Sequence, residues 1–235
     1  MSMLFVNTVR GCCLLIAITI GISGCSSVPP KPKVIDAQEA VTEKMLSAEL
    51  TQSFADALTL LRDEKFQQSE VMLLNITSEY PDFAGPWSNL AIAQLSLEKY
   101  DDSLMSINKS LAVDEKFCPS LSLKGIILRE LGRFSEAKVA YLSAIECNPE
   151  DMISLYNLGV LSDLYLHDDA SALFYYERYL VALNETEGAS KDSTVESWVV
   201  GLKRRVPEEQ RIVRTIKKDK TEAEVTTPQQ LAGEE

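Results

Sequence analysis

The stretch that decides the fold is Cys118–Asp151, which reads CPSLSLKGIILRELGRFSEAKVAYLSAIECNPED. Its pattern predicts two short helices joined by a tight turn. Pro119 suits the first turn of a helix, where its missing N–H is not needed, and Gly132 favours the left-handed exit of a helix. Pro149 stops the second helix, because proline cannot continue the helical hydrogen-bond ladder. Two helices this short cannot bury both of their apolar faces alone, so the segment needs stacked neighbours.

Matching segments precede and follow it at a spacing of 34 residues. This step aligns a row of small side chains: Ala57, Ala91, Gly125 and Gly159. The same step aligns three aromatic side chains: Phe66, Tyr100 and Phe134. Such a spacing of helix–turn–helix units is the sequence signature of a repeat solenoid, in which each unit stacks on the next.

In these features the chain resembles the tetratricopeptide repeat (TPR) family. Counted from Cys118, the residues that match the family's pattern stand at positions 8, 20, 24, 27 and 32 of the unit: Gly125, Ala137, Tyr141, Ala144 and Pro149. The unit from Met152 needs one extra residue near His167 to keep the same register. The resemblance implies an all-α TPR solenoid of about four helix–turn–helix repeats, spanning residues 46–183.

Residues 1–24 are expected to be a signal peptide that takes no part in the fold. Arg10 precedes an apolar run that is shorter than the about 20 residues of a membrane-spanning helix. The residues Ile22-Ser23-Gly24-Cys25 resemble the bacterial lipoprotein box, which implies cleavage before Cys25 and lipidation of that cysteine. The alternative is an ordinary signal peptide in which the cysteine occurs by chance. By the sorting tendency of such lipoproteins, Ser26 implies the outer membrane, with the chain lipid-anchored on its periplasmic face.

Residues 25–45 would then hold the lipidated cysteine and a linker, since Ser26–Val41 begins rich in proline, lysine and serine. The whole chain is acidic, with a formal net charge of −12 at pH 7. This charge argues against nucleic acid as a partner, because phosphate binding needs clustered lysine and arginine. It also argues against adsorption on anionic lipid by charge, so the lipid anchor is the expected contact with the membrane.

Residues 195–218 are expected to form the C-terminal capping region of the solenoid. Val195, Trp198, Val199 and Leu202 fall on one face of a helix, and a solenoid needs an end helix with a polar outer face. We expect Trp198 to pack on the fourth repeat; the alternative is a tryptophan that recognises a partner at the surface. Residues 219–235 are charged and contain proline and glutamine, which predicts a disordered tail.

Two cysteines, Cys118 and Cys147, remain in the mature domain. They stand at positions 1 and 30 of one repeat, and the two helices of a repeat run antiparallel, so both thiols lie at the same end of a helical hairpin. In an oxidising compartment they are candidates for a disulfide. The alternative is a pair of small buried hydrophobic side chains that do not meet.

Little in the chain supports catalysis. The single histidine, His167, falls in the turn of the divergent repeat, where a solvent-exposed side chain is more typical than a catalytic base. The adjacent acids Asp101-Asp102 and Asp168-Asp169 stand at expected helix starts, where carboxylates cap the helix and interact with its dipole; metal binding is the alternative there. The sequence therefore indicates a protein that is not an enzyme and that uses no metal, cofactor or small-molecule substrate.

The TPR resemblance implies a peptide-binding groove lined by the first helix of each repeat. Carried over residue by residue, it comprises Phe54, Leu58, Ile92, Leu95, Ile126, Arg129, Tyr156 and Val160. The lysine and asparagine residues with which the family binds acidic peptide ends are missing at two of these repeat positions, so we expect an apolar or amphipathic peptide or helix. The alternative is that this row forms the inner core, or that the N-terminal helix fills the groove.

The leader and the short repeat array together favour a non-catalytic periplasmic scaffold that binds a protein or peptide partner in the cell envelope. This architecture resembles the pilotins that help type IV pilus secretins reach the outer membrane, which implies a role in assembling such a complex. Alternatives are an adaptor for peptidoglycan enzymes or for a TonB-type system, and a structural protein that self-associates through its repeats.

Overall fold

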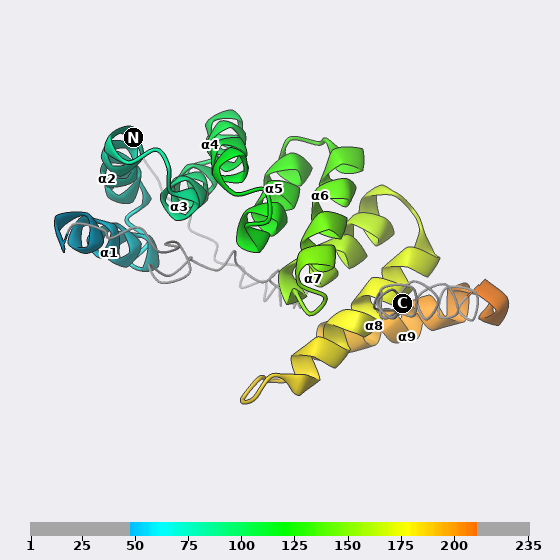
Figure 1. Cartoon of the computed structure of the whole chain (residues 1–235). Helices are drawn as coiled ribbons and strands as arrows, with labels where there is room; N and C mark the ends of the chain where they lie inside the picture. Colours follow the sequence, from blue (N-terminus) through cyan, green and yellow to red (C-terminus); the bar gives the residue numbers. More distant parts are fainter. Residues whose placement is uncertain (1–47, 211–235) are drawn as a thin grey trace, which may run out of the picture.

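The structure, a computed structural model, describes residues 48–210 of the chain (Figure 1). Over these residues it consists of helices and connecting turns, with no β-strand. The helices are α1 Ala48–Arg62, α2 Phe66–Glu79, α3 Ala84–Ser96, α4 Tyr100–Val113, α5 Cys118–Glu130, α6 Phe134–Cys147, α7 Met152–Val160, the π-helix η1 Leu161–Tyr165, α8 Asp169–Glu185 and α9 Ser193–Arg205.

The helices form consecutive pairs that follow one another along the molecule, from α1 and α2 at one end to α8 and α9 at the other (Figure 1). Each second helix packs against the first helix of its own repeat and against the first helix of the next. The first helices also pack on one another: α1 on α3, α3 on α5, and α5 on α7. We therefore call the first helices the inner layer and the second helices the outer layer. The predicted all-α TPR solenoid is confirmed.

The turns between the two helices of each repeat all need one residue with a left-handed backbone. Gly132 adopts it in the third repeat, with φ at 70°, as predicted. The equivalent residues of the first two repeats are Glu64 and Glu98, with φ at 58° and 59°, and in the fourth repeat His167 has φ at 50°. Since side chains with a Cβ disfavour this region, only Gly132 occupies the position without strain.

The extra residue predicted near His167 is accommodated by the π-helix η1. Its wider turn contains one more residue than an α-helical turn, and the backbone N–H of Leu166 donates to the carbonyl of Leu161 at 3.0 Å. After η1, the side chain of Asp168 caps α8 by accepting a hydrogen bond from the backbone N–H of Ser171 at 2.9 Å. The fourth repeat therefore regains the register of the others within one turn.

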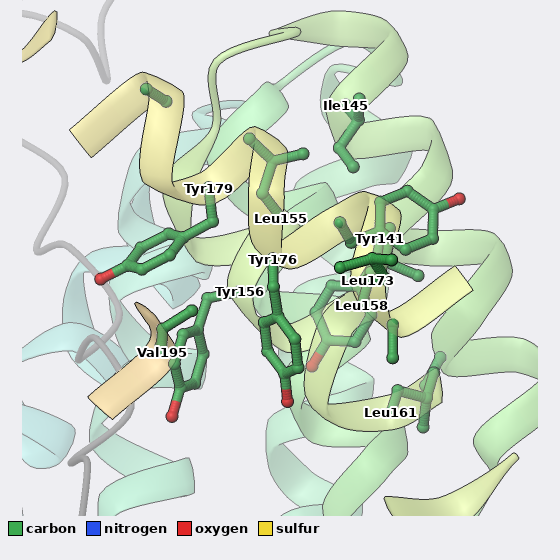
Figure 2. Close-up of a cluster of buried hydrophobic side chains, with 14 of the residues drawn as sticks. Tyr141, Ile145, Leu155, Tyr156, Leu158, Leu161, Leu173, Tyr176, Tyr179 and Val195 are labelled. Carbon is green, nitrogen blue, oxygen red and sulfur yellow. The ribbon is translucent and has the colours of Figure 1, made fainter. Parts of the chain in front are cut away.

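The core between the two layers depends on matched sizes at positions 8 and 24 of each repeat. A Cβ added to Gly125 would lie 2.4 Å from the ring of Tyr141, and one added to Gly159 would lie 2.4 Å from the ring of Tyr176. Figure 2 shows both tyrosines among the leucines of this core. In the first two repeats, position 8 holds alanine and position 24 holds a side chain smaller than tyrosine: Ala57 with Leu73, and Ala91 with Ile107. All of these side chains are buried.

Helix α9 covers the last repeat, as predicted. Val195, Val199 and Leu202 are buried against it, and the side chain of Asp192 caps the helix by accepting from two backbone N–H groups. Trp198 is half-buried and lies with its ring centroid 5.4 Å from that of Tyr176. The tryptophan thus packs on the fourth repeat, as expected.

Several sequence predictions fall outside the described residues. They are the signal peptide at 1–24, the linker at 25–45 with Cys25, the end of the capping region at 211–218 and the tail at 219–235. Within residues 48–210, no helix has both the length and the apolar character needed to cross a lipid bilayer.

Candidate functional site

The residues predicted to line a groove lie on the inner layer, but most of them are buried. Fractional exposures are 5% for Ile92 and 7% for Ile126, and the other buried members are Phe54, Leu58 and Tyr156. Only Leu95, Arg129 and Val160 are half-buried. The five buried residues belong to the core, and Leu95, Arg129 and Val160 are the predicted groove residues that reach the surface.

The buried members belong to two clusters of core side chains. Leu58 and Ile92 pack in a cluster that runs from the first repeat into α5, and Ile126 and Tyr156 pack in the cluster of the last two repeats and α9. This arrangement corresponds to the stated alternative, in which the row forms the inner core. A role of the half-buried members in contacting a partner stays a prediction.

Arg129 is the charged group of the predicted groove, and its guanidinium is already partly engaged. It donates to the side-chain oxygen of Asn157 at 3.1 Å and to the carboxylate of Glu130 at 2.6 Å. The side chain is 15% exposed, and that of Glu130 is 36% exposed. Guanidinium hydrogen bonds to carboxylates are directional, so this pair offers a fixed polar contact at the third repeat.

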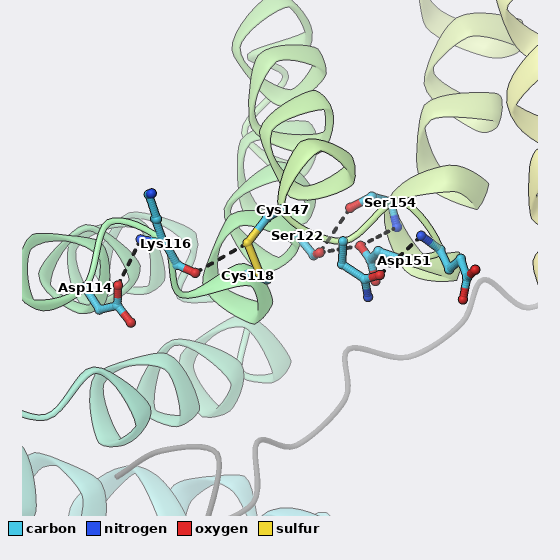
Figure 3. Close-up of a disulfide and its surroundings, with 9 residues drawn as sticks. Asp114, Lys116, Cys118, Ser122, Cys147, Asp151 and Ser154 are labelled. Carbon is cyan, nitrogen blue, oxygen red and sulfur yellow. Dashed lines mark hydrogen bonds between the residues drawn. A yellow bond between two sulfur atoms is a disulfide. The ribbon is translucent and has the colours of Figure 1, made fainter. Parts of the chain in front are cut away.

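Cys118 and Cys147 are joined by a disulfide in the structure, with their Cα atoms 5.7 Å apart (Figure 3). The bond ties the start of α5 to the end of α6. Beside it, the hydroxyl of Ser122 donates to the carboxylate of Asp151, and Ser154 donates to Ser122 at 3.0 Å. These bonds connect the third repeat to the fourth at the same end of the helices.

The fourth repeat carries a small cluster of charges next to η1. Arg205 of α9 donates to the carboxylate of Asp169 at 2.8 Å and lies 3.5 Å from Asp163. The hydrogen bond from Arg205 lowers the pKa of Asp169. Partial burial raises the pKa of Asp163, although Arg205 acts in the opposite direction. The cluster fastens the capping helix to the fourth repeat.

The structure places His167 in an exposed turn next to Asp168 and Asp169. Between residues 48 and 210, no three histidine, cysteine or acidic side chains gather closely enough to hold a metal ion. Asp168 serves as the N-cap of α8, and Asp101 and Asp102 lie in the first turn of α4, where they favour the helix dipole.

One set of exposed side chains was not identified from the sequence. At position 22 of the first three repeats, on the outer layer, Val71, Met105 and Val139 are 61%, 60% and 63% exposed. We call these three residues the outer row. Stepping by 34 residues from Val139 would have found it, because all three positions hold an apolar residue where a surface helix normally carries a polar one.

Comparisons with known proteins identify the fold. No family model matches the sequence, and a search of curated proteins gives no match. Among solved structures, PilF of Pseudomonas aeruginosa is 23% identical with a TM-score of 0.58, and the match covers 66% of this chain and 68% of that one.

Two further structures show the same likeness. TTC0263, a thermophilic TPR protein of Thermus thermophilus, is 14% identical with a TM-score of 0.56, covering 66% of this chain and 81% of that one. YrrB, described as a TPR protein with an unusual peptide-binding site, is 15% identical with a TM-score of 0.52, covering 66% and 74%. At these identities the likeness shows the fold, which is that of a TPR solenoid.

Proposed function

We propose that this chain is a non-catalytic TPR scaffold, lipid-anchored through Cys25 to the periplasmic face of the outer membrane. It binds a protein or peptide partner and helps an envelope complex of the type IV pilus or secretin type to assemble. The observation that carries the proposal is the fold, a solenoid of stacked helix pairs with a capped end. Stacked repeats create extended binding surfaces, and YrrB, which has a similar fold, is described as having a peptide-binding site.

The polar contact of the proposed site is Arg129 on the inner layer. Its side chain is 15% exposed and its guanidinium is bonded to Glu130 and Asn157, so its orientation is fixed before a partner arrives. Half-buried Val160 and Leu95 supply apolar surface on the same layer. A partner segment with an apolar face and a carboxylate or carbonyl group suits this combination.

The test compares two arginines of the third repeat in affinity capture from envelope membranes, followed by identification of the captured proteins. Arg129→Glu reverses the inner charge, whereas Arg133→Glu makes the same change on an exposed pair with Glu136. We expect Arg129→Glu to lose the captured partner and Arg133→Glu to keep it, with unchanged circular dichroism for both. Equal capture by both variants contradicts the inner-layer site, and capture of cell-wall enzymes alone contradicts the secretin-type role.

The anchor rests on the residues Ile22-Ser23-Gly24-Cys25 at the end of the leader. A cysteine carrying several acyl chains holds a protein stably on a membrane, whereas a single chain binds only marginally. We expect Cys25→Ser to abolish fatty-acid labelling and to release the protein from the outer-membrane fraction. Labelling that persists in this variant would falsify the anchor without bearing on the scaffold.

A further inference from the structure

The outer row is a surface feature that the proposed scaffold function does not use. Its side chains, Val71, Met105 and Val139, are exposed to nearly the same extent on three successive second helices. Leu74 and Leu142, one helical turn further on, are 44% and 39% exposed. Single exposed apolar side chains are ordinary on protein surfaces, but the same apolar position repeated across neighbouring helices indicates an interaction surface.

The row ends at the fourth repeat. With the one-residue insertion counted, the equivalent residue is Phe174, which is half-buried, and the guanidinium of Arg178 lies 5.7 Å from the centre of its ring. This cation–π contact partly covers the aromatic ring of Phe174. The exposed row therefore spans α2, α4 and α6, with α4 at its centre.

Charges on α4 stand symmetrically about the row. Asp101 lies four residues before Met105 and Lys109 four residues after it, and all three side chains are exposed on one face of the helix. On the flanking helices the equivalent residues are uncharged: Gln67 and Asn75 on α2, and Ser135 and Ser143 on α6. Along its outer face, α4 thus presents an acid, an apolar side chain and a base.

We propose that the outer row is the surface through which two copies of this chain associate. The two-fold axis runs along the row, so that α4 lies antiparallel on its own copy and crosses it at Met105. This arrangement places Asp101 against Lys109 of the partner subunit and, by symmetry, Lys109 against the partner subunit's Asp101. A pairing with the helices parallel would instead bring Asp101 against its own copy, which like-charge repulsion disfavours.

The chemistry of the row fits a second copy better than a lipid surface. Helices that lie on membranes carry lysine and arginine around their apolar face, whereas acids flank this row as well, among them the exposed Asp101, Asp102 and Glu136. Because the first helices pack on one another along the inner layer, the outer layer is the convex side. The centre of the contact is therefore α4, and Met105 contributes more than Val71 or Val139.

The first test is disulfide trapping in the full chain. The two-fold axis brings the two copies of residue 105 together, so Met105→Cys is expected to give a covalent dimer on mild oxidation, seen on a non-reducing gel. Val200→Cys on α9 is the control, since Val200 is 52% exposed but lies away from the row. No more dimer from Met105→Cys than from Val200→Cys and the wild type overturns the proposal.

The second test exchanges the two charges and measures the mass of the purified full chain by sedimentation velocity. Asp101→Lys and Lys109→Asp each bring like charges together and are expected to weaken the dimer about 10-fold or more, whereas the double variant restores the opposite-charge pairs and the dimer. A monomeric wild type, or a dimer unchanged in both single variants, overturns the proposal. Neither outcome bears on Arg129 and its partner, so the two proposals fail separately.

Discussion

Two rows of apolar side chains run along the repeats at the same spacing, and they have opposite surroundings. On the inner layer, Leu58 and Ile92 are 2% and 5% exposed; on the outer layer, Val71 and Met105 are 61% and 60% exposed. Both rows consist of aliphatic residues at one fixed repeat position. The difference shows that apolar periodicity identifies a repeat face without telling whether that face becomes core or surface.

The packing of the two layers accounts for the difference in exposure. First helices pack on one another from repeat to repeat, so their inward side chains are covered from both sides. Second helices pack against first helices, so the side of each that faces away from them stays exposed. The inner side chains, Leu58, Ile92 and Ile126, therefore belong to the core, and the outer row stays exposed.

The largest expected effect is the difference in stability between a buried and an exposed substitution in the third repeat. Ile126→Asp places a carboxylate where the side chain is 7% exposed, and a buried unpaired charge is expected to cost about 4 kcal/mol or more of unfolding free energy. Val139→Asp, at 63% exposure, is expected to change it by about 0.5 kcal/mol or less. Urea unfolding of dilute protein measures both values, and equal losses would contradict the assignment of the rows.

The next effect concerns the bond between the two layers. The disulfide from Cys118 to Cys147 closes a separation of 29 residues between the start of α5 and the end of α6. Its removal is expected to lower the unfolding free energy by about 3–4 kcal/mol, because the unfolded chain regains freedom. Urea unfolding with and without reducing agent measures the loss. The control is Cys118→Ala with Cys147→Ala, on which reducing agent should have no effect.

A smaller effect tests the contact between the layers. Gly125→Ala puts a Cβ 2.4 Å from the ring of Tyr141, and such overpacking is expected to cost about 1–3 kcal/mol despite the better helix propensity of alanine. In a Tyr141→Ile background, which copies the Ala91–Ile107 pair, the same change should become neutral or stabilising. Thermal unfolding of the four proteins gives the coupling; a loss that is equal in both backgrounds would contradict the size matching.

The smallest effect concerns the turns that connect the layers. Glu98 has a left-handed backbone with φ at 59°, so Glu98→Gly is expected to raise the unfolding free energy by about 0.5–1 kcal/mol. Gly132→Ala, at φ 70°, should lower it by about 1 kcal/mol. Denaturant midpoints with unchanged slopes measure both shifts. If both substitutions changed the unfolding free energy in the same direction, the left-handed backbone would not explain the effects.

Much of the fold could be predicted from the sequence. The spacing of small and aromatic residues located the helix pairs, Gly132 and Pro149 predicted the ends of two helices, and the register shift near His167 located the insertion that η1 accommodates. These features depend on local backbone preferences and on repetition, and both can be recognised from the residue types and their spacing.

The site was less predictable for a physical reason. Whether Ile92 or Met105 is buried depends on how tightly neighbouring repeats pack, and no single residue encodes that distance. The left-handed backbone of the first two turns could not be predicted either, because glutamate at positions 64 and 98 gives no signal for it. At position 22 of the first three repeats, the sequence shows an apolar repeat position, including Val71 and Met105, but not that this face is exposed.

The most direct measurement of the central claim is the rate of thiol labelling in folded, dilute protein with the native disulfide intact. Ile92→Cys and Met105→Cys place the same group on the inner and outer rows of one repeat. If the inner row is core and the outer row is surface, Met105→Cys reacts like a free thiol, whereas Ile92→Cys reacts only when the chain unfolds. Rapid labelling of Ile92→Cys in the folded protein would contradict the account.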